Sequence, residues 1–182
     1  HRRQRQMCIR DSLLEHIYKK GKAKRPNSPL GLIVAPTREL ALQVEDVLKD
    51  LDTGFSMTTL IGGVDIEKQI AELDNSVEIA VGTPGRILDL MRQRKLSLRS
   101  CGFIVLDEAD EMFSLGFFED VRAILARLPD RRQGIFVSAT ISPRVAMLGE
   151  TFLNKPEHLS VTPPDASPEN IEHLYVKVAS DL

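Results

Sequence analysis

Four residues that follow a short apolar run offer the strongest indication of chemistry in this sequence. Phe103–Leu106 has the composition of a buried strand, and it leads directly into Asp107-Glu108-Ala109-Asp110. Mg²⁺ binds oxygen ligands and usually keeps several waters, so one carboxylate at a strand tip can hold the ion indirectly. The neighbouring carboxylate can orient or polarise an attacking water in phosphoryl transfer. Acidic residues after a strand are also common helix caps, so capping is the alternative interpretation of these residues taken alone.

The other side chains with catalytic potential show no comparable pattern. The four His lie without metal-ligand or triad spacing, and Cys8 and Cys101 offer neither metal-ligand spacing nor a disulfide framework. A reducing cytoplasm is therefore the expected location. The formal net charge of −2 argues against a broad polyanion-binding surface, so any contact with nucleic acid must be local. No apolar run approaches the ~20 residues that span a bilayer, which predicts a soluble protein without a membrane partner.

The elements that must position the acidic residues follow from hydrophobic periodicity, which begins at residue 13. Strands are expected at 30–35, 55–61, 78–81, 103–106, 135–137 and 158–161. Helices are expected at 13–20, 38–51, 65–74, 117–128 and 143–152, with one more that begins at Pro84. This alternation predicts one α/β domain whose mostly parallel sheet carries helices on both faces. Functional residues collect at the carboxyl ends of the strands in such sheets.

Both ends of the chain differ in composition from this domain. Residues 1–12 hold four Arg against one Asp, begin without Met and resemble translated sequencing-adaptor sequence, which predicts a non-native lead. The alternative is a basic arm that binds nucleic acid. Residues 162–170 hold three Pro and no large apolar side chain, as a linker does, and residues 171–182 begin an alternating strand. One strand cannot form a domain, so we expect a chain cut from a longer protein at both ends.

Five short segments follow one another along the chain: Ala35-Pro36-Thr37-Arg38-Glu39-Leu40-Ala41, Gly62-Gly63, Thr83-Pro84-Gly85-Arg86, Asp107-Glu108-Ala109-Asp110 and Ser138-Ala139-Thr140. In order and spacing they match motif Ia, the GG element and motifs Ib, II and III of the DEAD-box RNA helicase family, which this chain resembles over about residues 13–178. The resemblance implies a RecA-like three-layer α/β/α sandwich over residues 13–161, without its first strand. It also places residues 171–182 in the first strand of a second RecA-like domain. A phosphoacceptor α/β domain would cluster carboxylates too, but it gives no reason for the Thr-Pro-Gly-Arg and Ser-Ala-Thr segments.

The resemblance implies ATP and Mg²⁺ as cofactors, with a role for each acidic residue. Asp107 would hold Mg²⁺ through a water, and Glu108 would position the hydrolytic water. Asp110 would hydrogen-bond to the side chains of Ser138 and Thr140 and so couple the ATP site to the RNA site. Two hydroxyl donors on one carboxylate at adjacent strand ends are chemically reasonable. A helix N-cap is the alternative for the Ser-Ala-Thr segment.

Seven further residues would, by the same resemblance, contact the sugar–phosphate backbone of single-stranded or duplex RNA. These residues are Pro36, Thr37, Arg38, Gly63, Thr83, Gly85 and Arg86. Small residues permit close approach, helix N-termini offer N–H groups to phosphate, and the Arg guanidinium forks to phosphate oxygens. Such contacts fix position and register without reading base sequence. Each segment is also a loop-to-helix junction, so capping and turn formation are the alternative.

One part of the family pattern is absent from this sequence. A phosphate-binding loop requires G-x-x-x-x-G-K-[ST], but Gly21-Lys22 is followed by Ala23, and His16 stands where the first Gly is needed. The adenine-reading Q motif is absent as well. We therefore expect a fragment of an ATP-dependent RNA helicase that does not hydrolyse ATP alone, with a non-catalytic RNA-binding or regulatory module as the alternative. The missing first strand would leave an unpaired apolar sheet edge beside the strand that ends at Ser138.

Overall fold

The computed structural model describes residues 15, 17, 19, 21–23, 25–50 and 54–159. The predicted lead at 1–12, the linker at 162–170 and the strand at 171–182 lie outside the described residues. Within the helix predicted at 13–20, Glu15, Ile17 and Lys19 are helical, and the N–H of Gly21 donates to the Ile17 carbonyl at 2.9 Å. Gly21 has a φ of +75°, the left-handed conformation with which many helices end.

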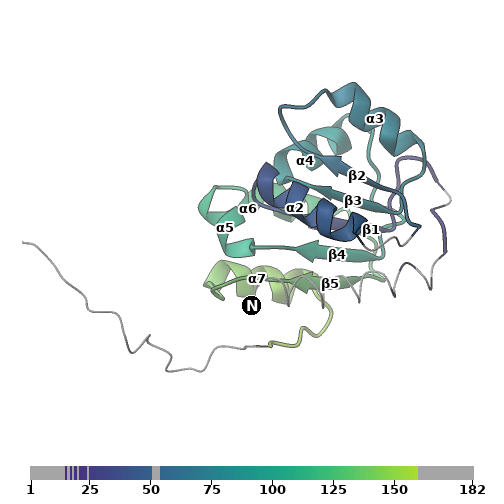
Figure 1. The fold of residues 1–182 in the computed structure, drawn as a ribbon. Coiled ribbons are helices and arrows are strands. Elements are labelled where there is room, and N and C mark those ends of the chain that lie inside the picture. Colours follow the sequence, from purple (N-terminus) through teal and green to yellow (C-terminus); the bar gives the residue numbers. More distant parts are fainter. Residues whose placement is uncertain are drawn as a thin grey trace, which may run out of the picture.

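Five parallel strands form the central sheet (Figure 1). They are β1 (Gly31–Val34), β2 (Met57–Leu60), β3 (Ile79–Gly82), β4 (Phe103–Leu106) and β5 (Gln133–Phe136). Their order across the sheet is β2-β3-β1-β4-β5. Parallel neighbours need a crossover connection, and helices supply it along this chain.

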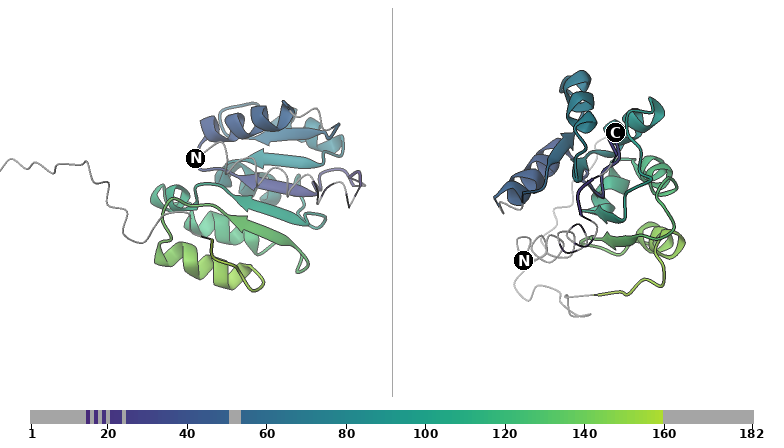
Figure 2. Two further views of the ribbon diagram at one scale, coloured as in Figure 1. Left: turned by 60° about the horizontal axis from the view of Figure 1, so that its bottom comes forward. Right: turned by 90° about the vertical axis from the view of Figure 1, so that its right-hand side faces the viewer.

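Helices cover both faces of the sheet. They are α2 (Arg38–Lys49), α3 (Ile66–Asp74), α4 (Pro84–Arg92), α5 (Ala109–Ser114), α6 (Phe118–Leu125) and α7 (Pro143–Phe152). Helix α2 packs on one face, and α3 to α7 contribute to the core on the other (Figure 2). Successive side chains of β1 pack in the two cores alternately. Leu32 and Val34 pack in the core with α3 to α7, and Ile33 packs in the core with α2. The predicted three-layer α/β/α sandwich with a parallel sheet is confirmed.

The predicted elements match the observed ones with two exceptions. Strand β4 and helix α7 have the predicted bounds, and the other predicted elements overlap the observed ones. Helix α5 was not predicted, because six residues are too few for helical periodicity to stand out. The strand predicted at 158–161 is wrong where the structure describes it. His158 and Leu159 are in no strand, and the 87% exposed side chain of Leu159 packs in no core.

Strand β5 lies at one edge of the sheet. Its one hydrogen-bonded neighbour among the described strands is β4, and its residues are half-buried or exposed. This edge is the one at which we predicted unpaired strand surface, and its tendency to associate stays a prediction. No helix in the described part of the chain is long and apolar enough to cross a membrane.

Candidate functional site

The strands end in step, which brings the five motif segments into one row. Val34 of β1 pairs in register with Gly82 of β3 and with Leu106 of β4. Gly82 also pairs with Leu60 of β2, and Leu106 with Phe136 of β5. The segments that follow these residues therefore lie side by side at the carboxyl ends of the strands, in the order GG element, motif Ib, motif Ia, motif II and motif III. We call this arrangement the row. The three predicted RNA segments share one half of the row, and the acidic and hydroxyl residues share the other.

Motif Ia and the GG element are in direct contact. The guanidinium of Arg38, the first residue of α2, lies so close to Gly63 that a Cβ there would be 2.2 Å from Nη1 of Arg38. Gly63 also has a φ of +75°, so its backbone conformation favours glycine, whereas the flexible Arg38 side chain can move away from an added Cβ. Thr37 caps α2, because its Oγ1 accepts a hydrogen bond from the N–H of Leu40 at 3.2 Å. Capping is thus an observed role of Thr37.

Motif Ib meets the other side of the same turn. Nη1 and Nη2 of Arg86 both donate to the carbonyl oxygen of Val64 at 3.3 Å. Thr83 occupies the N-cap position of α4, but its side chain makes no capping bond and is only 8% exposed. Gly85 is exposed with open space around it, whereas Pro36 of motif Ia is buried. Arg38, Gly63 and Arg86 therefore gather at the segment 61–65, which we call the GG turn.

The acidic pair begins the other half of the row. Asp107 is 8% exposed, and its N–H donates to the Val34 carbonyl at 2.9 Å, which continues the β1–β4 pairing. Glu108 has φ 54° and ψ 54°, a left-handed conformation that is unfavourable for a residue with a Cβ. It precedes α5 but makes no capping bond with its side chain, so the capping interpretation fails for Glu108. Backbone strain of this kind is typical of functional sites.

Asp110 connects motif II to motif III. One of its carboxylate oxygens accepts hydrogen bonds from the hydroxyl of Thr140 at 2.9 Å and from the Thr140 N–H at 3.0 Å. The N–H of Asp110 donates to Oγ of Ser138 at 3.2 Å. Burial raises the pKa of Asp110, but hydrogen bonds from Thr140, Ser138 and the Glu111 N–H outweigh it and hold the pKa below its ordinary value. Ser142, and not the Ser-Ala-Thr segment, caps the following helix α7.

The carboxylates of Asp107 and Glu108 suit a Mg²⁺ ion that a bound nucleotide also coordinates. No three His, Cys, Asp or Glu side chains in the described ranges gather into a site that could hold a metal ion. Carboxylates such as those of Asp107 and Glu108 suit Mg²⁺, which binds proteins through one or two carboxylates and completes its shell with waters and substrate phosphates. These residues therefore suit an ion that is shared with phosphates, and not one held by protein groups alone.

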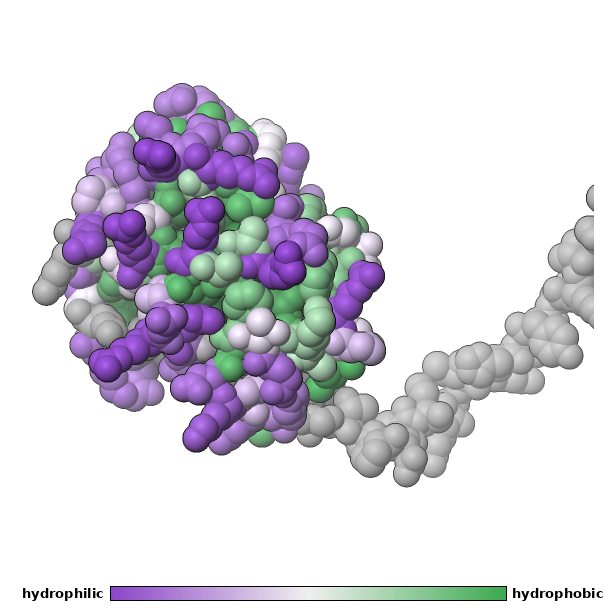
Figure 3. Space-filling view, turned by 180° about the vertical axis from the view of Figure 1, so that it is seen from behind, coloured by the Kyte–Doolittle hydropathy of each residue, from purple (hydrophilic) through white to green (hydrophobic). Residues whose placement is uncertain are grey.

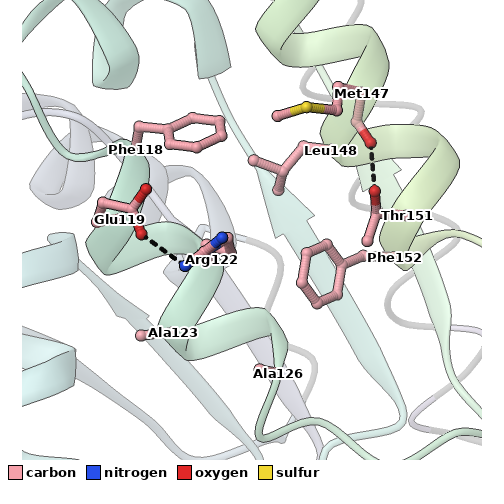
Figure 4. Close-up of a pocket in the computed structure, with 9 residues that line it drawn as sticks. All are labelled: Phe118, Glu119, Arg122, Ala123, Ala126, Met147, Leu148, Thr151 and Phe152. Carbon is pink, nitrogen blue, oxygen red and sulfur yellow. Dashed lines mark hydrogen bonds and ion pairs between the residues drawn. The ribbon is translucent and has the colours of Figure 1, made fainter.

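The α3–α7 side of the molecule carries a separate apolar feature. Apolar side chains are visible between polar ones on this side (Figure 3). A groove of about 500 Å³ between α6 and α7 is lined by side chains that include Phe118, Met147, Leu148 and Phe152 (Figure 4). None of the predicted site residues lines this groove, so it adds nothing to the row.

Sequence reasoning missed Gln69, a polar residue on the buried side of α3. Its side chain is 3% exposed, and its Nε2 donates to the carbonyl of Ile61 at 3.0 Å, at the start of the GG turn. A signal was present, because Gln69 interrupts the apolar face formed by Ile66, Ile70 and Leu73.

Comparisons with known proteins agree with this geometry. The family model described as DEAD/DEAH box helicase matches residues 8–148. The chain is 40% identical over 149 residues to DEAD-box ATP-dependent RNA helicase CshA of Streptococcus pneumoniae, covering 81% of this chain and 28% of that protein. It is 46% identical over 143 residues to ATP-dependent RNA helicase RhlB of Xanthomonas axonopodis, covering 76% of this chain and 25% of that protein.

A solved structure of a DEAD box protein from the hyperthermophile Methanococcus jannaschii matches with a TM-score of 0.67 and 35% identity. The match covers 72% of this chain and 37% of that one, and it supports the RecA-like description of the fold. The chain spans about a quarter of the length of the curated relatives it matches. With the family model covering most of its residues, the chain belongs to the DEAD/DEAH box helicase family.

Proposed function

We propose that this chain supplies an RNA-binding surface and part of the ATP site of an ATP-dependent RNA helicase that unwinds short RNA duplexes. The observation that carries the proposal is the single row at the carboxyl ends of the strands. Its two halves adjoin where β1 pairs with β4, so a phosphate backbone on one half would lie beside a nucleotide on the other.

The half of the row with the GG turn would bind the sugar–phosphate backbone of single-stranded or duplex RNA. Arg38 and Arg86 would each bind two phosphate oxygens, and the exposed Gly85 in the first turn of α4 would offer its backbone N–H. Pro36 and Thr83 are buried, so they would act through the backbone. These contacts would give affinity without base specificity, which suits a chain whose net charge is −2.

The acidic half of the row would serve ATP hydrolysis. Asp107 would hold Mg²⁺ through a water, and Glu108 would orient the attacking water. Bound with ATP, Mg²⁺ would neutralise charge that develops on the phosphates. Asp110 would join this half to motif III, because its carboxylate receives both the hydroxyl and the N–H of Thr140.

This chain alone would not complete the ATP site. It contains no G-x-x-x-x-G-K-[ST] segment, so neither a glycine-rich loop nor its Lys is available to hold the phosphates. We propose that the 182-residue chain has negligible RNA-stimulated ATPase activity, and that turnover requires a phosphate loop and a second RecA-like domain. The same observation favours a second candidate, a non-catalytic RNA-binding or regulatory module. A cytoplasmic location is proposed from cysteine usage alone.

RNA binding by the purified chain tests the first half of this proposal. Fluorescence anisotropy with a labelled single-stranded RNA should show affinity that is similar for different base sequences. Arg38→Ala and Arg86→Ala should each weaken binding and lower the slope of log K against log salt by about 0.7 per lost phosphate contact. Arg99→Ala is the matched control, because Arg99 is exposed and precedes β4, on the side of the sheet where the strands begin. Equal loss in all three variants would contradict the proposed surface.

ATPase measurements test the second half. The 182-residue chain should hydrolyse ATP no faster with RNA than without it, and robust RNA-stimulated turnover would refute the proposed inactivity. Extending the chain by its genomic upstream and downstream sequence separates the two candidates. Restored turnover that Glu108→Gln abolishes supports the helicase. If the extended chain binds RNA without turnover, the non-catalytic module is the better description.

A further inference from the structure

The GG turn is held by one side chain from each of three helices. Arg38 of α2 packs against Gly63, and Arg86 of α4 donates two N–H groups to the Val64 carbonyl. Gln69 of α3 donates its Nε2 to the Ile61 carbonyl at 3.0 Å. The two arginines belong to the proposed RNA surface, whereas nothing so far gives Gln69 a function.

Gln69 is an unfavourable choice for its position if packing is all that matters. Its side chain is 3% exposed and belongs to the same helix face as the apolar Ile66, Ile70 and Leu73. Its Oε1 is buried and accepts no hydrogen bond from any described group. A buried polar atom without a partner is destabilising, and Met, a linear side chain of similar length, would avoid that loss. The compensating feature is the single bond to Ile61.

That bond acts at the point where the chain leaves the sheet. The last ladder bond between β2 and β3 joins the Thr83 N–H to the Leu60 carbonyl at 3.0 Å. The carbonyl of the following residue, Ile61, lies beyond this ladder and accepts its hydrogen bond from Gln69. Gln69 therefore fixes the direction in which the backbone enters Gly62 and Gly63.

Gln69 differs from the two arginines in what it can do when RNA binds. Arg38 is exposed and Arg86 is half-buried, so a phosphate would compete with the Val64 carbonyl for the N–H groups of Arg86 and would draw Arg38 away from Gly63. Gln69 is buried and cannot reach a phosphate. Of these three contacts, it is the one that RNA binding at both arginines would leave in place.

We propose that Gln69 is a positioning residue of the RNA-binding surface, which holds the GG turn in place so that Arg38 keeps its geometry toward phosphate. This inference rests on the proposed function, because it assigns Gln69 to the same surface. It predicts that Gln69→Met weakens RNA binding about threefold to tenfold, the equivalent of one neutral hydrogen bond, without lowering the midpoint of thermal unfolding.

Four variants of the full 182-residue chain provide the test: Gln69→Met, Ile70→Met, Arg38→Ala and the double variant Gln69→Met/Arg38→Ala. Ile70→Met is the packing control, because Ile70 is 6% exposed and adjacent on the same helix. Each variant is measured by anisotropy with single-stranded RNA, by thermal unfolding, and by hydrogen exchange of the Gly63 amide. Gln69→Met should speed exchange at Gly63 and weaken RNA binding, whereas Ile70→Met should do neither. In the Arg38→Ala background, Gln69→Met should weaken RNA binding less than it does alone.

Three results would overturn the inference. Gln69→Met could bind RNA as tightly as the parent chain, it could lose no more affinity than Ile70→Met, or its loss could be undiminished in the Arg38→Ala background. Failure of the proposed function gives a different pattern. If Arg38→Ala leaves RNA binding unchanged, the RNA surface itself is wrong, and the assignment of Gln69 falls with it.

Discussion

The same substitution, Gly to Ala, should destabilise the fold far more in one strand of this sheet than in another. In β3, a Cβ on Gly82 would lie 2.4 Å from the carbonyl oxygen of Leu60 and 3.2 Å from Cγ1 of Ile87. In β5, a Cβ on Gly134 would lie 2.3 Å from Cδ2 of Leu153. The overlaps are equally severe, but the first obstacle is backbone of the neighbouring strand, and the second is the end of a flexible side chain.

The atoms that the new Cβ would meet decide how much each substitution should change the free energy of unfolding. Relief at Gly82 requires β2 and β3 to separate, so we expect Gly82→Ala to lower the free energy of unfolding by about 3 kcal/mol, at the upper end of overpacking effects. In a chain of this size that corresponds to a melting temperature lower by about 6–12 °C. Leu153 can rotate, and Ala restricts the unfolded chain, so Gly134→Ala should stay within about 1 kcal/mol of the parent in either direction.

Urea unfolding followed by circular dichroism measures both changes, with an unchanged m-value as the check that the folded state is retained. Gly82 is followed by Thr83 and accepts a hydrogen bond from the Ala35 N–H at 2.9 Å, so its displacement should also disturb motifs Ia and Ib and weaken RNA binding. Gly134→Ala should leave RNA binding intact. Equal destabilisation by the two substitutions would refute this reasoning about obstacles.

Three further predictions concern two buried side chains and one residue with a strained backbone. Burial raises the pKa of Glu78, but hydrogen bonds from the Ser56 hydroxyl and from the N–H groups of Ser56 and Ala23 outweigh burial and hold the pKa below its ordinary value. The ionised form of Glu78 therefore stabilises the fold. Glu78→Gln should destabilise by about 1–3 kcal/mol at neutral pH, and urea titrations should show the difference vanish as pH falls below the ordinary value of 4.5 and through the lowered pKa. Burial raises the pKa of the Cys101 thiol to about 12, so in a chain without other cysteines a thiol reagent at pH 8 should react only as urea unfolds it, and reaction with the native chain would contradict this. Glu108→Gly should be up to about 1 kcal/mol more stable than Glu108→Ala, because glycine relieves the left-handed backbone, and the reverse order in urea unfolding would exclude strain.

Hydrophobic periodicity predicted the layers of this fold because the apolar residues within each strand or helix show which of its faces are buried. Phe103–Leu106 is apolar throughout and is a strand buried on both faces. Pro143 opens α7 at the predicted residue, since proline is favoured in the first helical turn. The left-handed backbone of Glu108 could not be foreseen, because nothing local favours it and surrounding structure must impose it.

Of the contacts between loops at the carboxyl ends of the strands, the family resemblance predicted that of Asp110 with Thr140 and did not predict that of Arg86 with Val64. Arg86 reaches Val64 across 22 positions, and Asp110 reaches Thr140 across 30. Sequence pattern cannot reveal such pairs, because strand order and register decide which loops meet. Gln69 is the intermediate case. Its polar side chain on an apolar helix face signalled a buried hydrogen bond but did not identify its partner.

The position of β1 limits how the two halves of the row can influence each other. The end of β1 is bonded on both sides, since the Ala35 N–H donates to the Gly82 carbonyl and the Val34 carbonyl accepts from the Asp107 N–H, each at 2.9 Å. The backbone distance between motif Ia and motif II is thus fixed by ladder bonds in the middle of the sheet. If the chain binds nucleotide and RNA as proposed, coupling between them within this domain would not act through the spacing of β1 and β4. It would act through segments beyond the strand ends, and among the described residues side chains hold such segments at the Asp110–Thr140 contact and at the GG turn.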